Sequence, residues 1–276
     1  MNLSRVQSRE APKMKIIAAA LAALSLTACG LLAQSPTMSC REQNGGNGFA
    51  FCEVRETTIP SLATLNVDGR QNGGISIKGA NRSDILVRAM VQTQGASDAE
   101  AKNTGAQVIV LTSAGTVQAD GPAQKNWSVS YEIFVPANTN LSLKANNGGV
   151  SISGVESSME FHSVNGGISL KGVGGNVRGD TVNGGVSVTL ASARWNGQGL
   201  DVTTKNGGVS MKVPEHFSAQ LDLSTVNGGM SVKLPDAQPA RRGDHKLNLT
   251  LGSGGPLIRI RTQNGGVSVS SSSAAA

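Results

Sequence analysis

One short unit occurs seven times in the sequence: Asn-Gly-Gly followed by an apolar residue, a serine and a second apolar residue. Repetition on this scale constrains the fold strongly, because a repeating sequence builds a repeating structure. Counted from Asn147, consecutive units lie 18, 18, 23, 21 and 37 residues apart. A period of about 20 residues is typical of proteins in which one short element stacks on the next. The seven units begin at Asn72, Asn147, Asn165, Asn183, Asn206, Asn227 and Asn264.

The residue types of the unit indicate how each copy turns. Asparagine tolerates the left-handed region of backbone space and glycine enters it freely, so Asn-Gly-Gly predicts a sharp corner. The apolar-serine-apolar triplet predicts a short strand with two side chains pointing inward and the serine outward. A single copy cannot bury its apolar side, so neighbouring copies are expected to stack. Aromatic residues make up only 3% of the chain, which indicates a narrow core of aliphatic side chains.

Two all-β architectures satisfy this pattern. In a β-solenoid, or β-helix-like stack of short strands, equivalent asparagines lie ~4.8 Å apart and can form a ladder of amide hydrogen bonds. In an antiparallel β meander, each Asn-Gly is instead the tip of a hairpin. The regular 18-residue period, with the same strand after every corner, favours the solenoid. The longer interval before Asn264 has room for one further coil without the signature, around residues 247–251.

The segment before the repeats also predicts strands, together with one short helix. Apolar and polar residues alternate over residues 85–91 and 129–135, as expected of half-buried strands. A helix is predicted near residues 98–105. Residues 97–100 have the spacing of a capping box, and Gly105 can close the far end.

The beginning of the chain predicts export. A basic stretch is followed by an apolar run within residues 14–29, which is too short to span a bilayer and is typical of a secretory signal. Residues 1–28 are therefore predicted to be a signal peptide, with Met14 as an alternative start.

The sequence Leu-Thr-Ala-Cys at residues 26–29 resembles the bacterial lipobox. This resemblance implies that Cys29 is lipidated on its thiol and becomes the mature N-terminus. Acyl chains hold a protein at a membrane because each buried CH₂ contributes about 0.8 kcal/mol. Gly30 follows instead of aspartate, and by resemblance to the enterobacterial sorting rule this indicates the outer membrane.

The remainder of the chain divides into three parts. Residues 29–57 are expected to be a tether for the lipid anchor, residues 58–270 the β-repeat domain, and residues 271–276 a disordered tail. The tether contains Cys40 and Cys52, and an oxidising compartment favours a disulfide between them over two free thiols. No histidine lies nearby, which argues against a zinc site.

Residues 131–234 resemble an adhesin-like family of bacterial envelope proteins that has no assigned function. The shared features are an apolar strand that ends in Val-Pro, here Phe134-Val135-Pro136, and the Asn-Gly-Gly corners that follow at Asn147, Asn165 and Asn183. The resemblance covers most of residues 58–270. It implies the repeated β architecture and carries over no catalytic residue.

Enzymatic chemistry needs converging groups, and the sequence predicts no catalytic, cofactor or metal site. His162 and Ser163 are adjacent and Asp180 lies one repeat later, but serine is common throughout the chain. Asp180, Asp201 and Asp222 are each 21 residues apart and could line up on a solenoid, although solvated charges explain this spacing equally well.

Two Arg-Gly-Asp tripeptides, at residues 178–180 and 242–244, could bind integrins if they were exposed on loops, but such tripeptides arise easily in a glycine-rich chain.

These observations predict a non-enzymatic envelope lipoprotein that presents a rigid β-repeat surface for adhesion or scaffolding. Its expected contacts are the membrane, through lipidated Cys29, and an unidentified protein or glycan surface partner. The net charge of +6 includes +3 from residues 1–28, which leaves too little for a nucleic-acid footprint. The alternatives are a carbohydrate-active enzyme on a β-helix, with carboxylates gathered in a groove, and an accessory protein of envelope stress.

Overall fold

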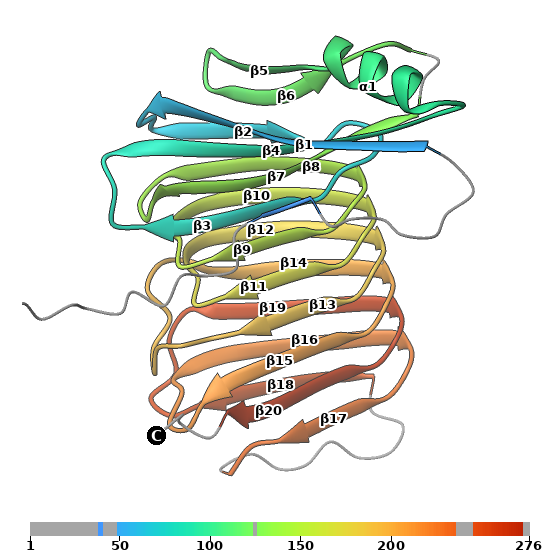
Figure 1. Cartoon of the computed structure of the whole chain (residues 1–276). Coiled ribbons are helices and arrows are strands. Elements are labelled where there is room, and N and C mark those ends of the chain that lie inside the picture. Colours follow the sequence, from blue (N-terminus) through green and yellow to red (C-terminus); the bar gives the residue numbers. More distant parts are fainter. Residues whose placement is uncertain (1–37, 41–48, 124–125, 236–244, 273–276) are drawn as a thin grey trace, which may run out of the picture. The chain divides into compact units, whose positions relative to one another are not determined.

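A computed structural model describes residues 38–40, 49–123, 126–235 and 245–272, which form two facing β-sheets and one helix (Figure 1). Sheet A contains, in spatial order, β1 (Phe49–Pro60), β4 (Asp84–Gly95), β7 (Trp127–Pro136), β3 (Ile75–Ala80), β9 (Val150–Ser153), β11 (Ile168–Lys171), β13 (Val186–Thr189), β15 (Val209–Pro214), β20 (Val267–Ser272) and β17 (Met230–Lys233). Sheet B contains β18 (Lys246–Leu251), β16 (Ala219–Asn227), β19 (Leu257–Asn264), β14 (Gly199–Asn206), β12 (Gly174–Asn183), β10 (Glu156–Asn165), β8 (Asn140–Asn147), β2 (Thr64–Asp68), β6 (Thr116–Asp120) and β5 (Ile109–Ser113). The predicted signal peptide and Cys29 lie outside the described residues.

The repeats form a flattened β-solenoid. Each coil runs along a strand of sheet B, turns at Asn-Gly-Gly, continues along a strand of sheet A and returns to sheet B through a second corner. Strands of neighbouring coils are parallel and in register, for example β10 with β12 and β11 with β13. The solenoid prediction is therefore confirmed, and the antiparallel meander is wrong for the repeats. Antiparallel pairs occur at the ends of the sheets, where β4 lies between β1 and β7 and where β5 pairs with β6.

The triplet after each corner has the predicted alternation. Val150 and Ile152 are buried while Ser151 between them faces outward, and later copies repeat this pattern, except that Met230 on the edge strand β17 is only partly buried. The inward side chains of both sheets form one continuous core, made mostly of valine, isoleucine and leucine. Burial of these apolar side chains is the main force that holds the coils together.

The C-terminal coil is not at the end of the stack. Strand β19 pairs in parallel with both β14 and β16, and β20 pairs with both β15 and β17. The coil that turns at Asn264 is thus inserted between the coils that turn at Asn206 and Asn227. The further coil expected around residues 247–251 is wrong, because these residues form β18, an antiparallel edge strand on β16.

The predicted helix is α1 (Asp98–Gln107), beside β4 at one end of the stack. Ser97 is its N-cap, with Oγ accepting a hydrogen bond from the Glu100 backbone nitrogen at 3.2 Å. Gly105 does not end the helix as expected but lies inside its last turn. A Cβ at Gly105 would be 2.6 Å from the Phe51 ring, so this glycine allows α1 to pack closely on β1.

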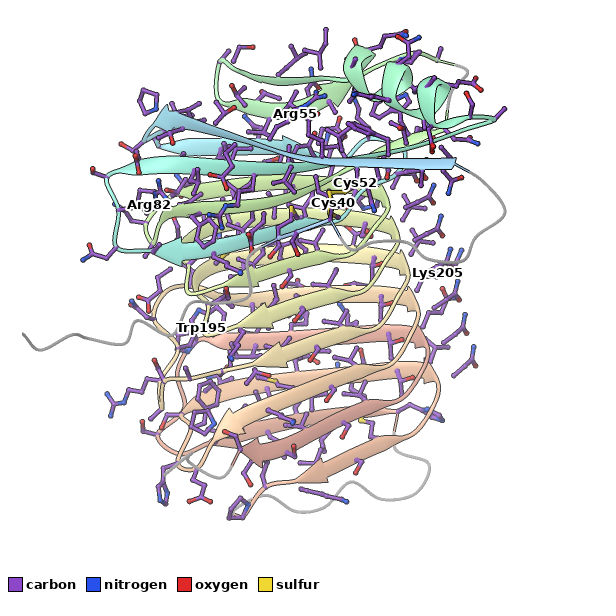
Figure 2. The ribbon with its side chains drawn as sticks, viewed as in Figure 1. Cys40, Cys52, Arg55, Arg82, Trp195 and Lys205 are labelled. Carbon is purple, nitrogen blue, oxygen red and sulfur yellow. A yellow bond between two sulfur atoms is a disulfide. The ribbon has the colours of Figure 1, made fainter. Side chains whose placement is uncertain are left out.

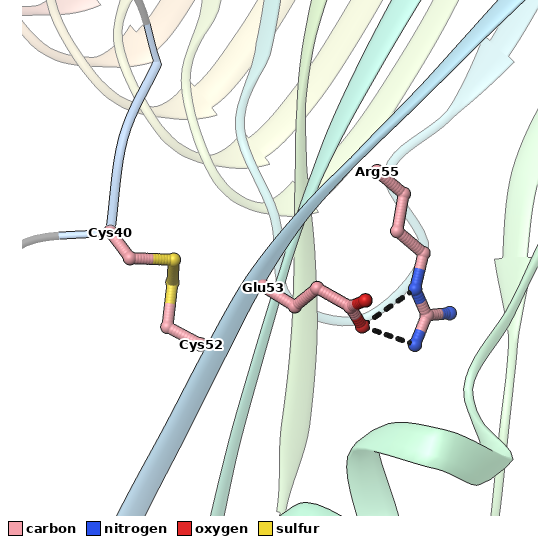
Figure 3. Close-up of a disulfide and its surroundings, with 4 residues drawn as sticks. All are labelled: Cys40, Cys52, Glu53 and Arg55. Carbon is pink, nitrogen blue, oxygen red and sulfur yellow. Dashed lines mark hydrogen bonds and ion pairs between the residues drawn. A yellow bond between two sulfur atoms is a disulfide. The ribbon is translucent and has the colours of Figure 1, made fainter.

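Cys40 and Cys52 form a disulfide with a Cα–Cα distance of 5.8 Å, which confirms the predicted pair (Figure 3). It joins residues 38–40 to β1, which is already part of sheet A. Part of the expected tether therefore belongs to the β domain. At the other end, Ser271 and Ser272 of the expected tail belong to β20. On β1, Arg55 binds Glu53 at 2.9 Å (Figure 3) and also donates to the backbone oxygens of Gly105 and Val108 at the end of α1.

Candidate functional site

The corners align the seven asparagines in one exposed ladder. Each link is a hydrogen bond from the Nδ2 of one side chain to the Oδ1 of the next, with donor–acceptor distances of 2.7–3.0 Å. An asparagine amide has two N–H groups and two acceptor lone pairs, so interior members keep one donor and one acceptor directed elsewhere. The order along this asparagine ladder is Asn72, Asn147, Asn165, Asn183, Asn206, Asn264 and Asn227.

The glycines of these corners are needed for a reason other than the predicted one. None of them, and none of the seven asparagines, has a left-handed φ. Instead, a Cβ on the first glycine of a pair would overlap a backbone carbonyl of the neighbouring strand, as at Gly184 against Gly166. The expectation of left-handed corners is therefore wrong. Close approach of two backbones is what excludes a side chain here.

A buried row of hydroxyl groups lies two residues before the asparagines, and sequence reasoning missed it. Thr204, for example, is fully buried, and its Oγ1 donates to the Gly184 carbonyl of the neighbouring coil at 2.7 Å. These bonds satisfy carbonyl groups that the close-packed corner hides from water. The repeat is therefore better written Ser/Thr-x-Asn-Gly-Gly. The hydroxyl row consists of Ser163, Thr181, Thr204, Thr262 and Thr225.

The outer face of sheet A carries two parallel rows of polar side chains beside a strip of glycine. The strand register places the seven serines of the repeat next to one another, as Ser169 lies between Ser151 and Ser187. Two residues further along each strand, lysine alternates with a hydroxyl residue. The serine row is Ser76, Ser151, Ser169, Ser187, Ser210, Ser268 and Ser231. The second row, called the lysine row, is Lys78, Ser153, Lys171, Thr189, Lys212, Ser270 and Lys233.

Most of the lysine row lacks a counter-charge. Lys171, Lys212 and Lys233 make no ion pair with any described residue. The six strands from β9 to β17 in sheet A, all described in full, contain no aspartate or glutamate. This part of the face is therefore positively charged, and it is flat because the remaining outward residues are glycine, serine, threonine and Pro214.

A shallow depression of about 300 Å³ lies on this face. It is lined by residues 185–187 and 208–210 together with Gly266, which are the second corner glycines and the residues after them. The missing side chains of the glycines leave a hollow strip between the asparagine ladder and the serine row. An extended ligand that lies along the stack can thus contact backbone, amide, hydroxyl and ammonium groups.

At the end of sheet A formed by β1, β4, β7 and β3, the charged side chains are ion-paired with one another. Glu132, only 5% exposed, binds Lys78 at 2.6 Å and Arg88 at 3.4 Å. Burial raises the pKa of Glu132, but hydrogen bonds from Lys78, Arg88 and the Met38 backbone outweigh it, and the net pKa is lowered. Lys78 and Arg88 also lie 5.3 Å from the Phe134 ring centroid. Because Arg88 also binds Glu56 at 2.7 Å, Lys78 is part of a neutralised cluster, unlike the three lysines further along.

The outer face of sheet B is different, because several of its charges are paired across strands, although Lys205, labelled in Figure 2, makes no ion pair with a described residue. Arg259 binds Asp222 at 3.0 Å and Asp201 at 3.5 Å, and Arg261 binds Asp201 at 2.9 Å. The row of aspartates suggested by the 21-residue spacing is wrong. Asp201 and Asp222 flank Arg259, whereas Asp180 lies opposite Thr203.

The catalytic candidates of the sequence come together only in part. His162 Nδ1 lies 2.8 Å from Asp180 Oδ2 on the surface of sheet B, within a depression of about 420 Å³ that also contains Glu160 and Arg178. Ser163 points the other way, into the core, and donates to the Gly148 carbonyl. This separates the hydroxyl from the His–Asp pair, so the three do not form a nucleophilic triad.

Two features are absent from the described residues, namely a cluster that could bind a metal ion and a helix that could cross a membrane. No group of three or more His, Cys, Asp or Glu side chains there could hold a metal ion. No described helix combines the length and the hydropathy needed to cross a membrane. The tripeptide at residues 178–180 lies within β12 instead of on a loop, and the one at residues 242–244 lies outside the described part of the chain.

The fold and its corners define the class of protein as an all-β solenoid with an asparagine ladder. The family model described as Toastrack DUF4097 matches residues 53–270, and the chain belongs to this family. The family resemblance drawn from the Val-Pro strand and the Asn-Gly-Gly corners is thereby confirmed. Among curated proteins, none matches the chain.

Several solved structures are similar over most of the chain at low identity. A proposed cell adhesion protein from Clostridium sporogenes is 10% identical, with 80% of this chain and 100% of that chain covered and a TM-score of 0.41. A proposed adhesin from Bacteroides fragilis is 11% identical, with coverage of 80% and 97% and a TM-score of 0.43. A proposed lipid binding protein from Parabacteroides distasonis is 11% identical, with coverage of 81% and 98% and a TM-score of 0.32.

Proposed function

We propose that this chain is a non-enzymatic, lipid-anchored protein of the bacterial cell envelope that uses the outer face of sheet A for adhesion or scaffolding. The observation that carries the proposal is the composition of that face. It repeats glycine, serine and lysine or a hydroxyl residue in register from coil to coil. A flat face with one repeated chemistry suits contact with an extended or repetitive surface better than enclosure of a small molecule.

The rigidity of the stack supports this role. In-register strands, the asparagine ladder and the buried hydroxyl row hold each coil to its neighbours on both sides. Side chains on such a scaffold are positioned before the partner arrives, which lowers the entropy lost on binding.

The anchor is the second part of the proposal. Lipidated Cys29 would tie the chain to a membrane, with Gly30 favouring the outer membrane. Met38, where the described β domain begins, is the ninth residue after Cys29. A fully extended chain of this length reaches about 30 Å, so the anchor would keep the β domain near the bilayer.

Metabolic labelling with palmitate tests the anchor. Wild type should incorporate label and partition into the detergent phase, whereas Cys29→Ala should do neither. A matched Cys40→Ala,Cys52→Ala variant should label like wild type, because only the lipobox cysteine is proposed to be acylated. Equal labelling of wild type and Cys29→Ala would overturn this part of the proposal.

Blocking the face tests the contact surface. The mature chain with Cys29→Ala, fluorescently labelled, would be measured for binding to intact cells of the source bacterium and to its isolated envelopes. Ser187→Trp with Ser210→Trp covers sheet A and should weaken binding about tenfold, a loss of ~1.4 kcal/mol. Thr203→Trp on sheet B should change binding less than twofold. Equal effects on the two faces, or no binding by wild type, would contradict the proposal.

A second candidate function is a carbohydrate-active enzyme, and the depression on sheet B favours it. Glu160, Asp180 and Asp201 line this depression, and glycoside hydrolysis requires two carboxylates. However, Asp180 is bound by His162 and Asp201 by two arginines. Release of reducing ends from envelope polysaccharides by wild type, abolished in Glu160→Gln, would establish this alternative in place of the non-enzymatic proposal.

A further inference from the structure

We infer that the outer face of sheet A binds a linear anionic polysaccharide that lies along the stack, with Lys171, Lys212 and Lys233 contacting its acidic groups. This inference rests on the proposed function and specifies the partner of the same face. It follows from four observations: the unpaired charge, its spacing, the neighbouring polar rows and the absence of other binding chemistry.

The first observation is that the three lysines have no described counter-ion and share one row, whereas several cations elsewhere, such as Arg88 and Arg259, are paired across strands. On sheet B the same strand register brings Arg259 and Arg261 against Asp201. At the end of sheet A, Lys78 is bound by Glu132. A row of cations left without carboxylates over six successive strands is therefore complementary to an anion from outside the molecule.

The second observation is the spacing of the charges. Thr189 separates the strands of Lys171 and Lys212, and Ser270 separates those of Lys212 and Lys233. Two strand steps place successive lysines about 9.6 Å apart along the stack. One sugar of an extended polysaccharide advances by about one such strand step. The lysine row thus matches a polymer in which every second sugar can place an acidic group on the same side.

The third observation is that the rows beside the lysines suit sugar hydroxyl groups. The serine row offers hydroxyls that both donate and accept hydrogen bonds. Across the glycine strip, interior amides of the asparagine ladder keep one donor and one acceptor each. The depression over Gly185, Gly208 and Gly266 leaves space for a chain between these two rows.

The fourth observation concerns what this part of the face lacks. Strands β9, β11, β13, β15, β20 and β17 contain no aromatic residue, so bases of a single-stranded nucleic acid have no stacking platform. Their outward positions also lack the large apolar side chains that enter a membrane interface or anchor a protein partner. Ammonium and hydroxyl groups remain, and these recognise acidic sugars.

The test compares two polymers and two sets of lysines. Binding of polygalacturonate and of its fully methyl-esterified form to the mature chain with Cys29→Ala would be measured by calorimetry over a series of salt concentrations. Replacement of Lys171, Lys212 and Lys233 by glutamine should weaken polygalacturonate binding at least tenfold and flatten its salt dependence. Replacement of Lys102, Lys144 and Lys246 by glutamine removes the same charge from other surfaces and should change binding less than twofold.

A rescue variant distinguishes a row from a general charge effect. Ser153→Lys, Thr189→Lys and Ser270→Lys would be added to the triple glutamine variant, which shifts the lysines by one strand and keeps their alternation. This variant should regain binding to within threefold of wild type. Unchanged thermal unfolding across the set would show that every variant is folded.

The outcomes separate this inference from the proposed function. If polygalacturonate does not bind wild type, or binds no better than its methyl ester, the inference that the partner is an anionic polysaccharide is wrong. Tighter binding of single-stranded DNA of equal charge would overturn it as well. Cell binding that still depends on Ser187 and Ser210 would then leave the adhesion proposal standing without this partner.

Discussion

The two corners of each coil are built under opposite constraints. The Asn-Gly-Gly corner has the same length in every copy, and its backbone touches the neighbouring coil. The return corner, between a strand of sheet A and the next strand of sheet B, has no fixed length. Residues 154–155 and 172–173 form the short return corners, and residues 190–198 and 215–218 the longer ones. From Asn147 to Asn227, the differences in coil length therefore all fall on the side of the return corner.

This difference explains how an irregular sequence keeps regular faces. Strands on both sheets are aligned from the Asn-Gly-Gly corner, so an insertion at the return corner leaves their register unchanged. The corners also use glycine differently. Gly154 and Gly172 in the return corners have left-handed φ values of 64° and 56°, the role that was expected at Asn-Gly-Gly. Tight stacking at one corner thus permits variation at the other.

The largest expected effect comes from a methyl group at the tight corner. In Gly184→Ala the new Cβ would overlap the Gly166 carbonyl, and backbone on both sides prevents relief. We expect a loss of about 3 kcal/mol in the free energy of unfolding, measured in urea. Gly229→Ala is the matched control, because a Cβ there meets nothing within 4 Å, and its loss should stay below ~0.5 kcal/mol. Similar losses in both would refute backbone contact as the constraint.

The next effect concerns the buried hydroxyl row of the same corner. Thr204→Val keeps the shape of the side chain but leaves the Gly184 carbonyl without its hydrogen bond. An unsatisfied buried acceptor costs about 2 kcal/mol, so the urea midpoint should fall by a corresponding amount. Thr204→Ser retains the hydroxyl and should recover most of that loss. If the Thr204→Val variant were as stable as wild type, the hydroxyl row would have no stabilising role.

A smaller effect is expected in the exposed asparagine ladder. Asn183→Ala removes two amide hydrogen bonds, whereas Asn227→Ala at the end of the ladder removes one. At about 0.5 kcal/mol for each exposed bond, the interior variant should lose ~1 kcal/mol and the terminal one half of that. Calorimetric unfolding of the two variants measures the ratio, and equal losses would contradict a continuous ladder.

The smallest effect is predicted at the return corner. Two glycines inserted between Ala191 and Ser192 lengthen an exposed loop, and we expect a change below ~0.5 kcal/mol in unfolding free energy. The same insertion between Gly184 and Gly185 would displace every following strand from its partner and should prevent a cooperative transition. Equal tolerance at both sites would remove the distinction between the corners.

Sequence reasoning succeeded where the determinant is local. The serine of each triplet faces outward because alternation along a strand is a property of that strand alone. The helix at Ser97 was found for the same reason, from its own capping residues. The disulfide was predicted from the oxidising compartment and from the number of cysteines, since Cys40 and Cys52 are the two that remain after Cys29.

The failures share a different cause, which is contact between coils. The reason for Gly184 lies in a carbonyl of the neighbouring coil, so no local rule could supply it. The buried hydroxyls did leave a signal, because Ser or Thr stands two residues before Asn in five copies. Counting back from each Asn-Gly-Gly corner would also have shown that the three aspartates do not occupy equivalent positions. Asp201 and Asp222 lie five residues before their asparagines, whereas Asp180 lies three before Asn183.

The order of the coils is a further feature that the repeat pattern could not specify. Every copy presents the same corner and the same alternation, so any coil can pair with any other. The lysine row nevertheless depends on this order, because Ser270 must lie between Lys212 and Lys233. The insertion of the C-terminal coil is therefore the central claim of this account.

Disulfide trapping on the serine row tests that claim most directly. In one variant Ser210 and Ser268 become cysteine, and in the other Ser210 and Ser231. Adjacent parallel strands place the first pair about 4.8 Å apart and leave the second pair about 9.6 Å apart. A disulfide bridges Cα atoms up to ~6.8 Å apart, so the first variant should oxidise to an internal bond, detected by mass spectrometry of its peptides, and the second should not. Efficient bonding of Ser210→Cys to Ser231→Cys, without bonding to Ser268→Cys, would show that the coils stack in sequence order and would contradict the account.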